Sequence, residues 1–175
     1  LIANSQFIAT KIEKYYKRDS LVVYPPVDLN VFYPPEAVPI SGHRNSGGLT
    51  MSKNYFLAIG RFLHYKKFDL TIGAYSELGL PLKIVGQGPE EESLKRMVVS
   101  SHNIQFLPFV KTDGELRALY QNARAVIFPQ VEDFGLVAAE SVACGTPVIA
   151  YNAGGVREIV NAHSGVLFRE QSKKY

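Results

Sequence analysis

From Tyr55 onward the chain alternates short apolar runs with segments of helical periodicity, and this alternation limits the folds open to it. The runs have the length and the aromatic and β-branched content of strands, and they span residues 55–59, 82–85, 104–107, 125–128 and 147–150. Strands that are apolar throughout are buried on both faces, as in parallel sheets covered by helices. We therefore expect an α/β fold with a doubly wound parallel sheet, which binds ligands outside the carboxyl ends of its strands.

Several connecting segments carry helix signals. Asp69 is expected to cap the first helix, and Pro89 lies in the first turn of the second. Thr112 and Glu115 have the spacing of a capping box at the start of the third helix. The pattern also predicts a helix over residues 137–143, a short helix over 155–160 and a final extended piece over 165–168.

The sequence divides into three parts. Residues 1–36 predict a connecting helix and strand segment packed on the domain, with a helix N-cap at Asn4-Ser5. Residues 37–54, rich in Pro, Gly, Ser and Asn, predict a flexible loop. Residues 55–175 form the expected ligand-binding domain. The chain does not start with methionine, and we interpret it as a fragment of a longer protein.

Composition excludes several classes of protein. The 175 residues suit one compact domain, and their net charge of +3 is small and scattered, so nucleic acid is not an expected partner. No apolar run approaches the roughly 18 residues of a membrane span. The single cysteine, Cys144, excludes an internal disulfide and a cysteine-rich zinc site, and the four histidines lack metal-ligand spacing. No metal site is therefore predicted.

Two carboxylates eight residues apart form the densest chemical signal. Glu132 lies in the loop after the fourth strand, Glu140 lies about one turn into the next helix, and Gly135 lies between them. Free amides at the helix start favour an anion, and Gly135 lets phosphates approach the backbone. A nucleoside diphosphate-sugar fits such a site, because the amides can bind its phosphates and the carboxylates can bind its hydroxyls. Spacing alone leaves open an ordinary helix with acidic residues near its start.

Basic residues gather in the loop just beyond the first strand. Arg61 follows the strand end, and Lys66 and Lys67 lie further along. A guanidinium fork and an ammonium can stabilise the growing charge of a diphosphate leaving group in place of a metal. Taken alone, such a cluster is more often a solvated basic loop.

A glycine pair follows the second strand. Gly86 and Gly88 start like a dinucleotide-binding motif, but Glu91 stands where the third glycine would be. A tight turn before a helix that starts at Pro89 is the simpler interpretation. An NAD-dependent dehydrogenase is the weaker alternative, because the next strand also lacks an acidic residue at its end.

Taken together, these elements resemble the retaining glycosyltransferases of family 4. The resemblance covers about residues 1 to 170, and it rests on Glu132-x7-Glu140 with Phe134-Gly135 inside it, ACGTPVIA at 143–150, Gly60-Arg61 with Lys66, VGQGP at 85–89, GGVRE at 154–158, Asn4-Ser5 and YPPVD at 24–28. It implies a GT-B architecture, in which two Rossmann-like domains face each other across a cleft. This chain would be the C-terminal, donor-binding half, with the N-terminal acceptor domain absent from it.

The resemblance also implies a role for each site residue. Arg61 and Lys66 would hold the donor diphosphate, and Glu132 would contact hydroxyls of the donor sugar. The donor-binding set would further comprise Gly60, Gly86 and Phe134, the amides of Gly135, Leu136 and Val137 at phosphate or sugar, Glu140 at the ribose, and the backbone near Phe109 and Val110 at the nucleobase. Enzymes of this kind usually need neither a metal nor another cofactor.

Two positions depart from the family pattern. Lys67 follows Lys66 where the family usually has glycine, which affects the local turn and the choice of the lysine that meets phosphate. Pro108 stands where the family often has the glycine of an FLG run, which affects how the base is framed.

The pattern looks most like mannosyltransferases of polysaccharide or glycolipid assembly, which use GDP-mannose. We therefore expect retaining transfer of a hexose, with mannose favoured, to a saccharide or lipid-linked acceptor. The expected location is the cytoplasm or the cytoplasmic face of a membrane, with peripheral contact through the missing domain, and the fragment alone is expected to be inactive. The alternatives are a UDP- or ADP-sugar donor, a non-catalytic nucleotide-sugar binding module, and epimerisation or phosphorolysis on the same architecture.

Overall fold

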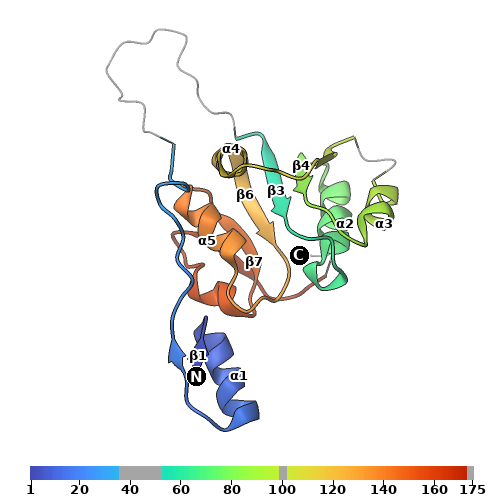
Figure 1. The fold of residues 1–175 in the computed structure, drawn as a ribbon. Helices are drawn as coiled ribbons and strands as arrows, with labels where there is room; N and C mark the ends of the chain where they lie inside the picture. Colours follow the sequence, from blue (N-terminus) through green and yellow to red (C-terminus); the bar gives the residue numbers. More distant parts are fainter. Residues whose placement is uncertain (36–52, 99–101, 173–175) are drawn as a thin grey trace.

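A six-stranded parallel sheet forms the centre of the structure (Figure 1). Its strands, in spatial order, are β5 (Ile104–Leu107), β4 (Leu82–Val85), β3 (Tyr55–Ile59), β6 (Ala123–Phe128), β7 (Val148–Tyr151) and β8 (Gly165–Phe168). Every neighbouring pair is parallel. The computed structural model describes residues 1–35, 53–98 and 102–172, so nearly all of the predicted loop at 37–54 lies outside the described residues.

Helices cover both faces of this sheet. One face packs against α2 (Phe68–Leu78) and α3 (Glu91–Arg96), and the other packs against α4 (Asp113–Asn122) and α5 (Leu136–Ala143). Two short 3-10 helices, η1 (His64–Lys66) and η2 (Gly155–Glu158), follow β3 and β7. The arrangement confirms the predicted doubly wound α/β fold.

Neighbouring residues of β3 show why the strands carry no polar alternation. Ala58 packs with Ile72 and Ile84 on the α2 side, whereas Leu57 packs with Val126 on the α4 side. Successive side chains of a strand point to opposite faces, so a sheet covered twice needs apolar residues at every position. The continuous apolar runs in the sequence are the direct result.

The strand order reverses between β3 and β6. From β3 the chain runs outward through β4 to β5, and it then returns to β6 on the other side of β3 before it continues to β8. Loops that leave two strands on opposite sides of such a reversal diverge and leave a crevice at the carboxyl edge of the sheet. The loops 60–67 and 129–135 therefore border the place where a ligand is expected.

The start of α2 differs from the prediction. Its N-cap residue is Lys67, which has a left-handed φ of 57° and makes no side-chain cap, and Asp69 lies inside the first turn. Phe68 is buried against Phe62, with ring centroids 5.0 Å apart. The helix thus starts two residues earlier than predicted, with Phe68 packed in the core, so the prediction of Asp69 as the cap was wrong. The capping box of Thr112, by contrast, is confirmed.

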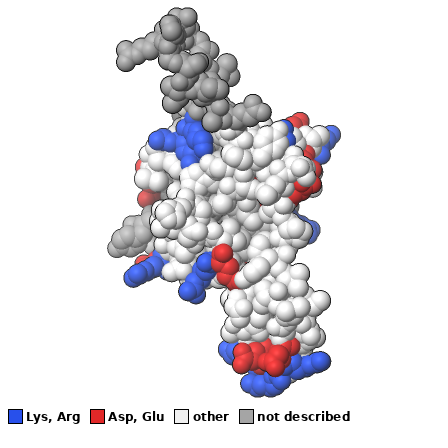
Figure 2. Space-filling model, turned by 90° about the vertical axis from the view of Figure 1, so that its left-hand side faces the viewer, with Lys and Arg blue, Asp and Glu red and all other residues white. Residues whose placement is uncertain are grey.

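A small unit precedes the main sheet. In it β1 (Ile2–Ala3) and β2 (Leu21–Val22) pair in parallel, and α1 (Gln6–Tyr16) connects them. Ser5 is the N-cap of α1, as predicted, and its Oγ accepts the N–H of Ile8 at 3.1 Å. No residue of α1 is buried, and Figure 1 shows the unit projecting from one end of the domain. In Figure 2 the far tip of this unit gathers both acidic and basic side chains.

The segment between β2 and residue 35 lies against α4. Phe32 is buried in the core on that side of the sheet. Arg117 donates to the carbonyl of Val31 at 3.0 Å, and Gln121 donates to the carbonyl of Tyr33 at 2.7 Å. This part of the connecting segment is therefore fixed to the domain by both apolar and polar contacts.

Candidate active site

Close backbone contact joins the loops that follow β3 and β4. The N–H of Phe62 donates to the carbonyl of Gln87 at 2.9 Å. A Cβ on Gly86 would lie only 1.9 Å from the carbonyl oxygen of Gly60, so a side chain is excluded there. Because Phe62 is completely buried, it anchors the loop and holds Arg61 at the edge of the sheet.

A cavity of 780 Å³ opens beside these loops, at the carboxyl ends of β3, β4 and β5. Its volume lies in the range of small-molecule sites, about 300–1,000 Å³. This β3–β5 cavity brings together five of the predicted site residues, Gly60, Arg61, Gly86, Phe109 and Val110. Further polar lining comes from Gln87, Lys111, Thr112 and Asp113.

A second cavity, of 430 Å³, lies at the end of β6. This β6 cavity brings together another five predicted residues, Lys66, Glu132, Phe134, Gly135 and Leu136. Asn4, Pro25 and Tyr65 also line it, so the N-terminal unit contributes to its wall. The two cavities divide ten of the twelve predicted site residues between them, and Val137 and Glu140 line neither.

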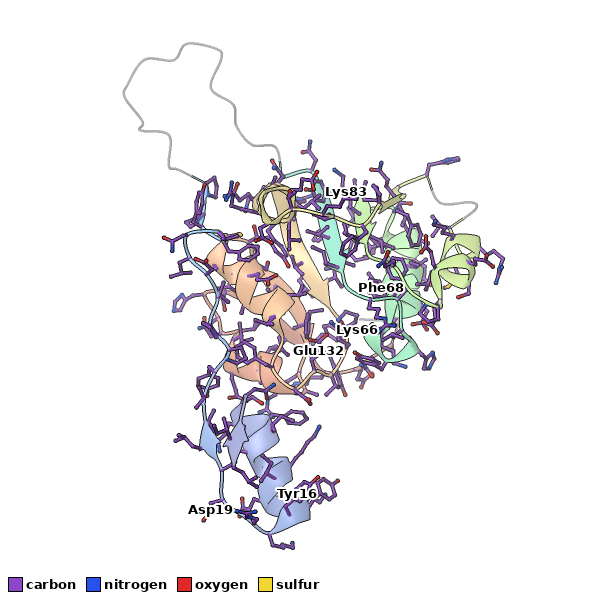
Figure 3. All side chains as sticks on the ribbon, in the orientation of Figure 1. Tyr16, Asp19, Lys66, Phe68, Lys83 and Glu132 are labelled. Atoms are coloured by element: carbon purple, nitrogen blue, oxygen red, sulfur yellow. The ribbon has the colours of Figure 1, made fainter. Side chains whose placement is uncertain are left out.

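An ion pair spans the β6 cavity. Lys66 comes from η1 after β3, Glu132 comes from the loop after β6, and their charged groups point toward one another (Figure 3). The Glu132 carboxylate also accepts a hydrogen bond from Gln130 at 2.9 Å. Both charged side chains are mostly shielded from solvent, with 14% and 18% exposure. The strand-order reversal thus brings a cation and an anion 66 positions apart in the chain into direct contact.

The start of α5 borders the same cavity. Gly135 is its N-cap, with a φ of 109° that favours glycine, and a Cβ there would lie 3.3 Å from the Phe128 ring. Leu136 and Val137 are the first two residues of the helix, so their amides have no acceptor within it. The Val137 side chain packs against the core and lines neither cavity.

Glu140 lies apart from Glu132, although the sequence suggested that both face one pocket. Its Oε2 accepts a hydrogen bond of 2.8 Å from the hydroxyl of Tyr120, a fully buried residue. Burial is the main cause that raises the pKa of Glu140; the Tyr120 hydrogen bond opposes it, and the nearby Asp113 charge adds to it. The structure therefore holds Glu140 as a partly desolvated, oriented carboxylate on the α4 side.

Replacing Glu140 with glutamine is expected to stabilise the fold at pH 7. The folded state disfavours the ionised carboxylate, because the pKa of Glu140 is raised, and an amide oxygen can still accept the Tyr120 hydrogen bond. We expect a gain of about 0.5–1 kcal/mol in the free energy of unfolding, as for other stabilising changes at functional sites. Thermal unfolding at several pH values measures it.

The pH dependence gives this prediction its control. As the pH falls through the folded pKa of Glu140, the wild-type carboxyl takes up a proton, and the advantage of Glu140→Gln should disappear. Glu77→Gln, at an exposed position on α2, should show no such gain at any pH. A variant at position 140 that is less stable than wild type at pH 7 would contradict the account.

Several contacts that support the site were not predicted, although Gly155 itself lies in the GGVRE motif at 154–158. Gly155 approaches so closely that a Cβ would lie 2.3 Å from the carbonyl oxygen of Asp133, and its N–H donates to the Glu132 carbonyl at 2.9 Å. It thereby supports the loop that carries Glu132. Gln130 and Tyr120 orient the two carboxylates, and of these Gln130 had a signal, since it lies two residues beyond the end of β6.

Within residues 1–35, 53–98 and 102–172, no cluster of three or more His, Cys, Asp or Glu side chains could hold a metal ion. Over the same ranges, no helix has the length and apolar character needed to cross a bilayer.

The fold and its cavities identify the structural class of this protein. A doubly wound parallel sheet with close glycine loops and cavities at its carboxyl edge is a Rossmann-like α/β domain. Residues 39–174 match the family model described as "Glycosyl transferases group 1". The chain belongs to this family, whose members have the GT-B fold.

Curated relatives match over nearly the whole chain. An uncharacterized glycosyltransferase of Methanocaldococcus jannaschii is 27% identical in an alignment 171 positions long, which covers 95% of this chain and 44% of the relative. A D-inositol 3-phosphate glycosyltransferase of Mycobacteroides abscessus is 34% identical in an alignment 182 positions long, gaps included, which covers 95% of this chain and 40% of the relative. The chain thus spans less than half the length of these relatives.

Solved structures share the fold. Anabaena HepE in complex with UDP and glucose superimposes with a TM-score of 0.78 at 23% identity, over 99% of this chain and 50% of the other. Sucrose-phosphate synthase from Thermosynechococcus elongatus superimposes with a TM-score of 0.81 at 24% identity, over 98% of this chain and 45% of the other.

Proposed function

We propose that this chain is the donor-binding half of a retaining glycosyltransferase that moves a hexose from a nucleoside diphosphate-sugar to a saccharide or lipid-linked acceptor. The observation that carries the proposal is the Lys66–Glu132 pair at the start of α5, beside a cavity of nucleotide size. An N-terminal acceptor domain, supplied by the rest of the protein, is part of the proposal. The reaction takes place at the cytoplasmic face of a membrane or in the cytoplasm.

The two cavities suggest how a donor would bind. The larger β3–β5 cavity would take the nucleoside, with the backbone near Phe109 and Val110 at the base. The smaller β6 cavity would take the hexose, with Glu132 at its hydroxyls. The diphosphate would then lie between them, where Arg61 lines one cavity and Lys66 lines the other.

The chemistry at the diphosphate is stabilisation of charge. As the bond from the sugar C1 to the diphosphate oxygen breaks, negative charge grows on the leaving group. Arg61, Lys66 and the first amides of α5 are donors of the kind that stabilise such charge. Lys66 has three N–H donors, so it can keep Glu132 and bind a phosphate oxygen as well. These cations would take the place of a metal ion.

Retention follows if the acceptor attacks from the face that the diphosphate leaves. The acceptor oxygen forms the new bond to C1 while the old C1–O bond breaks on the same side. The acceptor proton goes to an oxygen of the leaving diphosphate, which serves as the base. Glu140, oriented by Tyr120, would hydrogen-bond the ribose hydroxyls and fix the nucleoside during this step.

GDP-mannose is the donor we propose first, on the sequence resemblance. A UDP-sugar is the second candidate, because Anabaena HepE crystallised with UDP and with UDP-glucose and shares this fold. An ADP-sugar is the third. The β3–β5 cavity has polar side chains near the expected base position, and direct comparison of the nucleotides decides among the three.

The experiment is calorimetric titration of the chain with GDP, UDP and ADP, first without metal and then with Mg²⁺. We expect one nucleoside diphosphate to bind preferentially without metal. Arg61→Ala should weaken it about 10- to 100-fold, the usual loss for charge-assisted hydrogen bonds. Arg96→Ala, at an exposed position on α3, is the matched control and should leave the affinity unchanged.

Other outcomes identify the alternatives. Binding of NADH in place of these nucleotides would favour a dehydrogenase. Nucleotide binding without any transfer by the full-length protein would favour a binding module. Failure of both binding and transfer in the full-length protein would refute the proposal.

A further inference from the structure

One carboxylate of the main domain receives three hydrogen bonds from the N-terminal unit. Glu158, the last residue of η2, accepts the N–H of Gln6 at 2.8 Å and the N–H of Phe7 at 3.0 Å. It also accepts the hydroxyl of Tyr24 at 2.9 Å, and this bond raises the pKa of Tyr24. Both oxygens of Glu158 are thus directed at the start of α1 and at the segment after β2.

A second contact holds the same end of α1 to the site loop. The Ser5 hydroxyl, which is fully buried, donates to the carbonyl of Asp133. Lys11 lies 3.7 Å from the Asp133 carboxylate. The first turn of α1 therefore lies directly against the loop that carries Glu132.

The two sides of this junction are built differently. Gly155 and Val156 of η2 are buried, so Glu158 extends from a well-packed base. Among the described residues, the start of α1 is held to η2 by the polar contacts of Glu158. A carboxylate at the first amides of a helix is also favourable with respect to the helix dipole. Glu158 therefore fixes the start of α1 against the main domain.

The position of α1 matters because Asn4 directly precedes its cap. Asn4 lines the β6 cavity together with Lys66 and Glu132. Its side-chain amide offers both a donor and an acceptor, which suits a sugar hydroxyl. Its Oδ1 lies 3.3 Å from the Ser5 hydroxyl, whose single proton is donated to the closer Asp133 carbonyl. Its remaining capacity can serve a ligand.

We propose that Glu158 is a positioning residue of the transfer reaction, which holds α1 so that Asn4 completes the sugar side of the site. The inference rests on the proposed function, since it assigns the β6 cavity to the donor hexose. Neither Glu158 nor Asn4 lines the β3–β5 cavity, so neither should affect the nucleoside. The inference therefore predicts a separation between sugar-dependent and nucleotide-dependent properties.

The test compares variants of the full-length protein. Glu158→Ala and Asn4→Ala should each lower kcat/KM about 10- to 100-fold, the range for a misplaced positioning group. The Kd of the nucleoside diphosphate should stay at the wild-type value. Glu158→Gln keeps one acceptor oxygen and should give intermediate activity. Glu77→Gln on α2 is the control, and since Glu158 is exposed, none of these changes removes a core residue.

Hydrogen exchange tests the position of α1 without any assay of transfer. The amides of Gln6 and Phe7 should exchange about 10-fold faster in Glu158→Ala, since each loses its hydrogen bond to the carboxylate. The double variant gives a further check. When Glu158 is already replaced by alanine, adding Asn4→Ala should lower kcat/KM little further.

The outcomes distinguish failure of the proposed function from failure of the positioning role of Glu158. No transfer by the wild type would refute the proposed function while the exchange result still reported on α1. Unchanged exchange at Gln6 and Phe7 would overturn the positioning role. Normal kcat/KM in both Glu158→Ala and Asn4→Ala would also overturn it. So would a loss of nucleoside diphosphate affinity as large as the loss in kcat/KM.

Discussion

Replacing Lys66 with alanine should lower kcat of the full-length enzyme by about 10²- to 10³-fold, as removal of one preorganised charge-stabilising donor does in other enzymes. Lys66 is the cation that pairs with Glu132 in the β6 cavity, and its side chain is largely shielded from water. Loss of the ammonium would leave the Glu132 carboxylate uncompensated next to the leaving diphosphate. Steady-state kinetics with the preferred donor measures the effect.

The adjacent lysine supplies the matched control. Lys67 caps α2 with a left-handed φ of 57° and does not line the β6 cavity. Lys67→Ala should therefore change kcat less than about 3-fold, well below the 10-fold that 1.4 kcal/mol represents. Equal losses in the two variants would mean that the charge of the loop, rather than the position of Lys66, matters, and would contradict the assignment.

Gly86→Ala should have the largest effect on stability, a loss of about 3 kcal/mol, at the upper end of the usual cost of overpacking. The new Cβ would lie 1.9 Å from the Gly60 carbonyl oxygen and 2.9 Å from the Phe62 ring. Backbone cannot yield as a flexible side chain can, so the loops after β3 and β4 would have to separate. Denaturant unfolding with comparison of midpoints and slopes measures the change.

Gly114→Ala is the control for this change. It adds the same methyl group near the start of α4, where nothing lies within 4 Å of the new Cβ. Because alanine favours a helix over glycine, this variant should be more stable by up to about 1 kcal/mol. Similar destabilisation by both alanines would show that the contact between the loops is not the cause.

The strands of this protein could be predicted because burial on both faces of the sheet requires continuous apolar runs in the sequence. The runs at 55–59 and 82–85 coincide with β3 and β4, and the capping box at Thr112 marks the start of α4. The spatial order of the strands could not be predicted from these runs. This order makes β3 and β6 neighbours and thereby brings Lys66 and Glu132 together.

Two of the unpredicted roles, those of Tyr120 and Glu158, depend on contacts distant in sequence. Tyr120 is one more inward residue of an amphipathic helix until the fold places its hydroxyl against Glu140. Glu158 stands in a short glycine-started segment, and its partners Gln6 and Phe7 lie about 150 residues earlier. Local patterns report periodicity and turns, and such long-range hydrogen bonds leave no trace in them.

The uneven attachment of the first 35 residues has a consequence for cooperativity. Val31 to Tyr33 share the core and the hydrogen bonds of α4, so they must unfold with the sheet. The β1–α1–β2 unit contributes almost nothing to that core and is held mainly by polar contacts near Glu158. Regions with few buried apolar contacts open at a lower free energy than the whole molecule. In this chain taken by itself, we therefore expect the first two dozen residues to open at a lower free energy than the sheet, whose cooperative unit extends back to Val31.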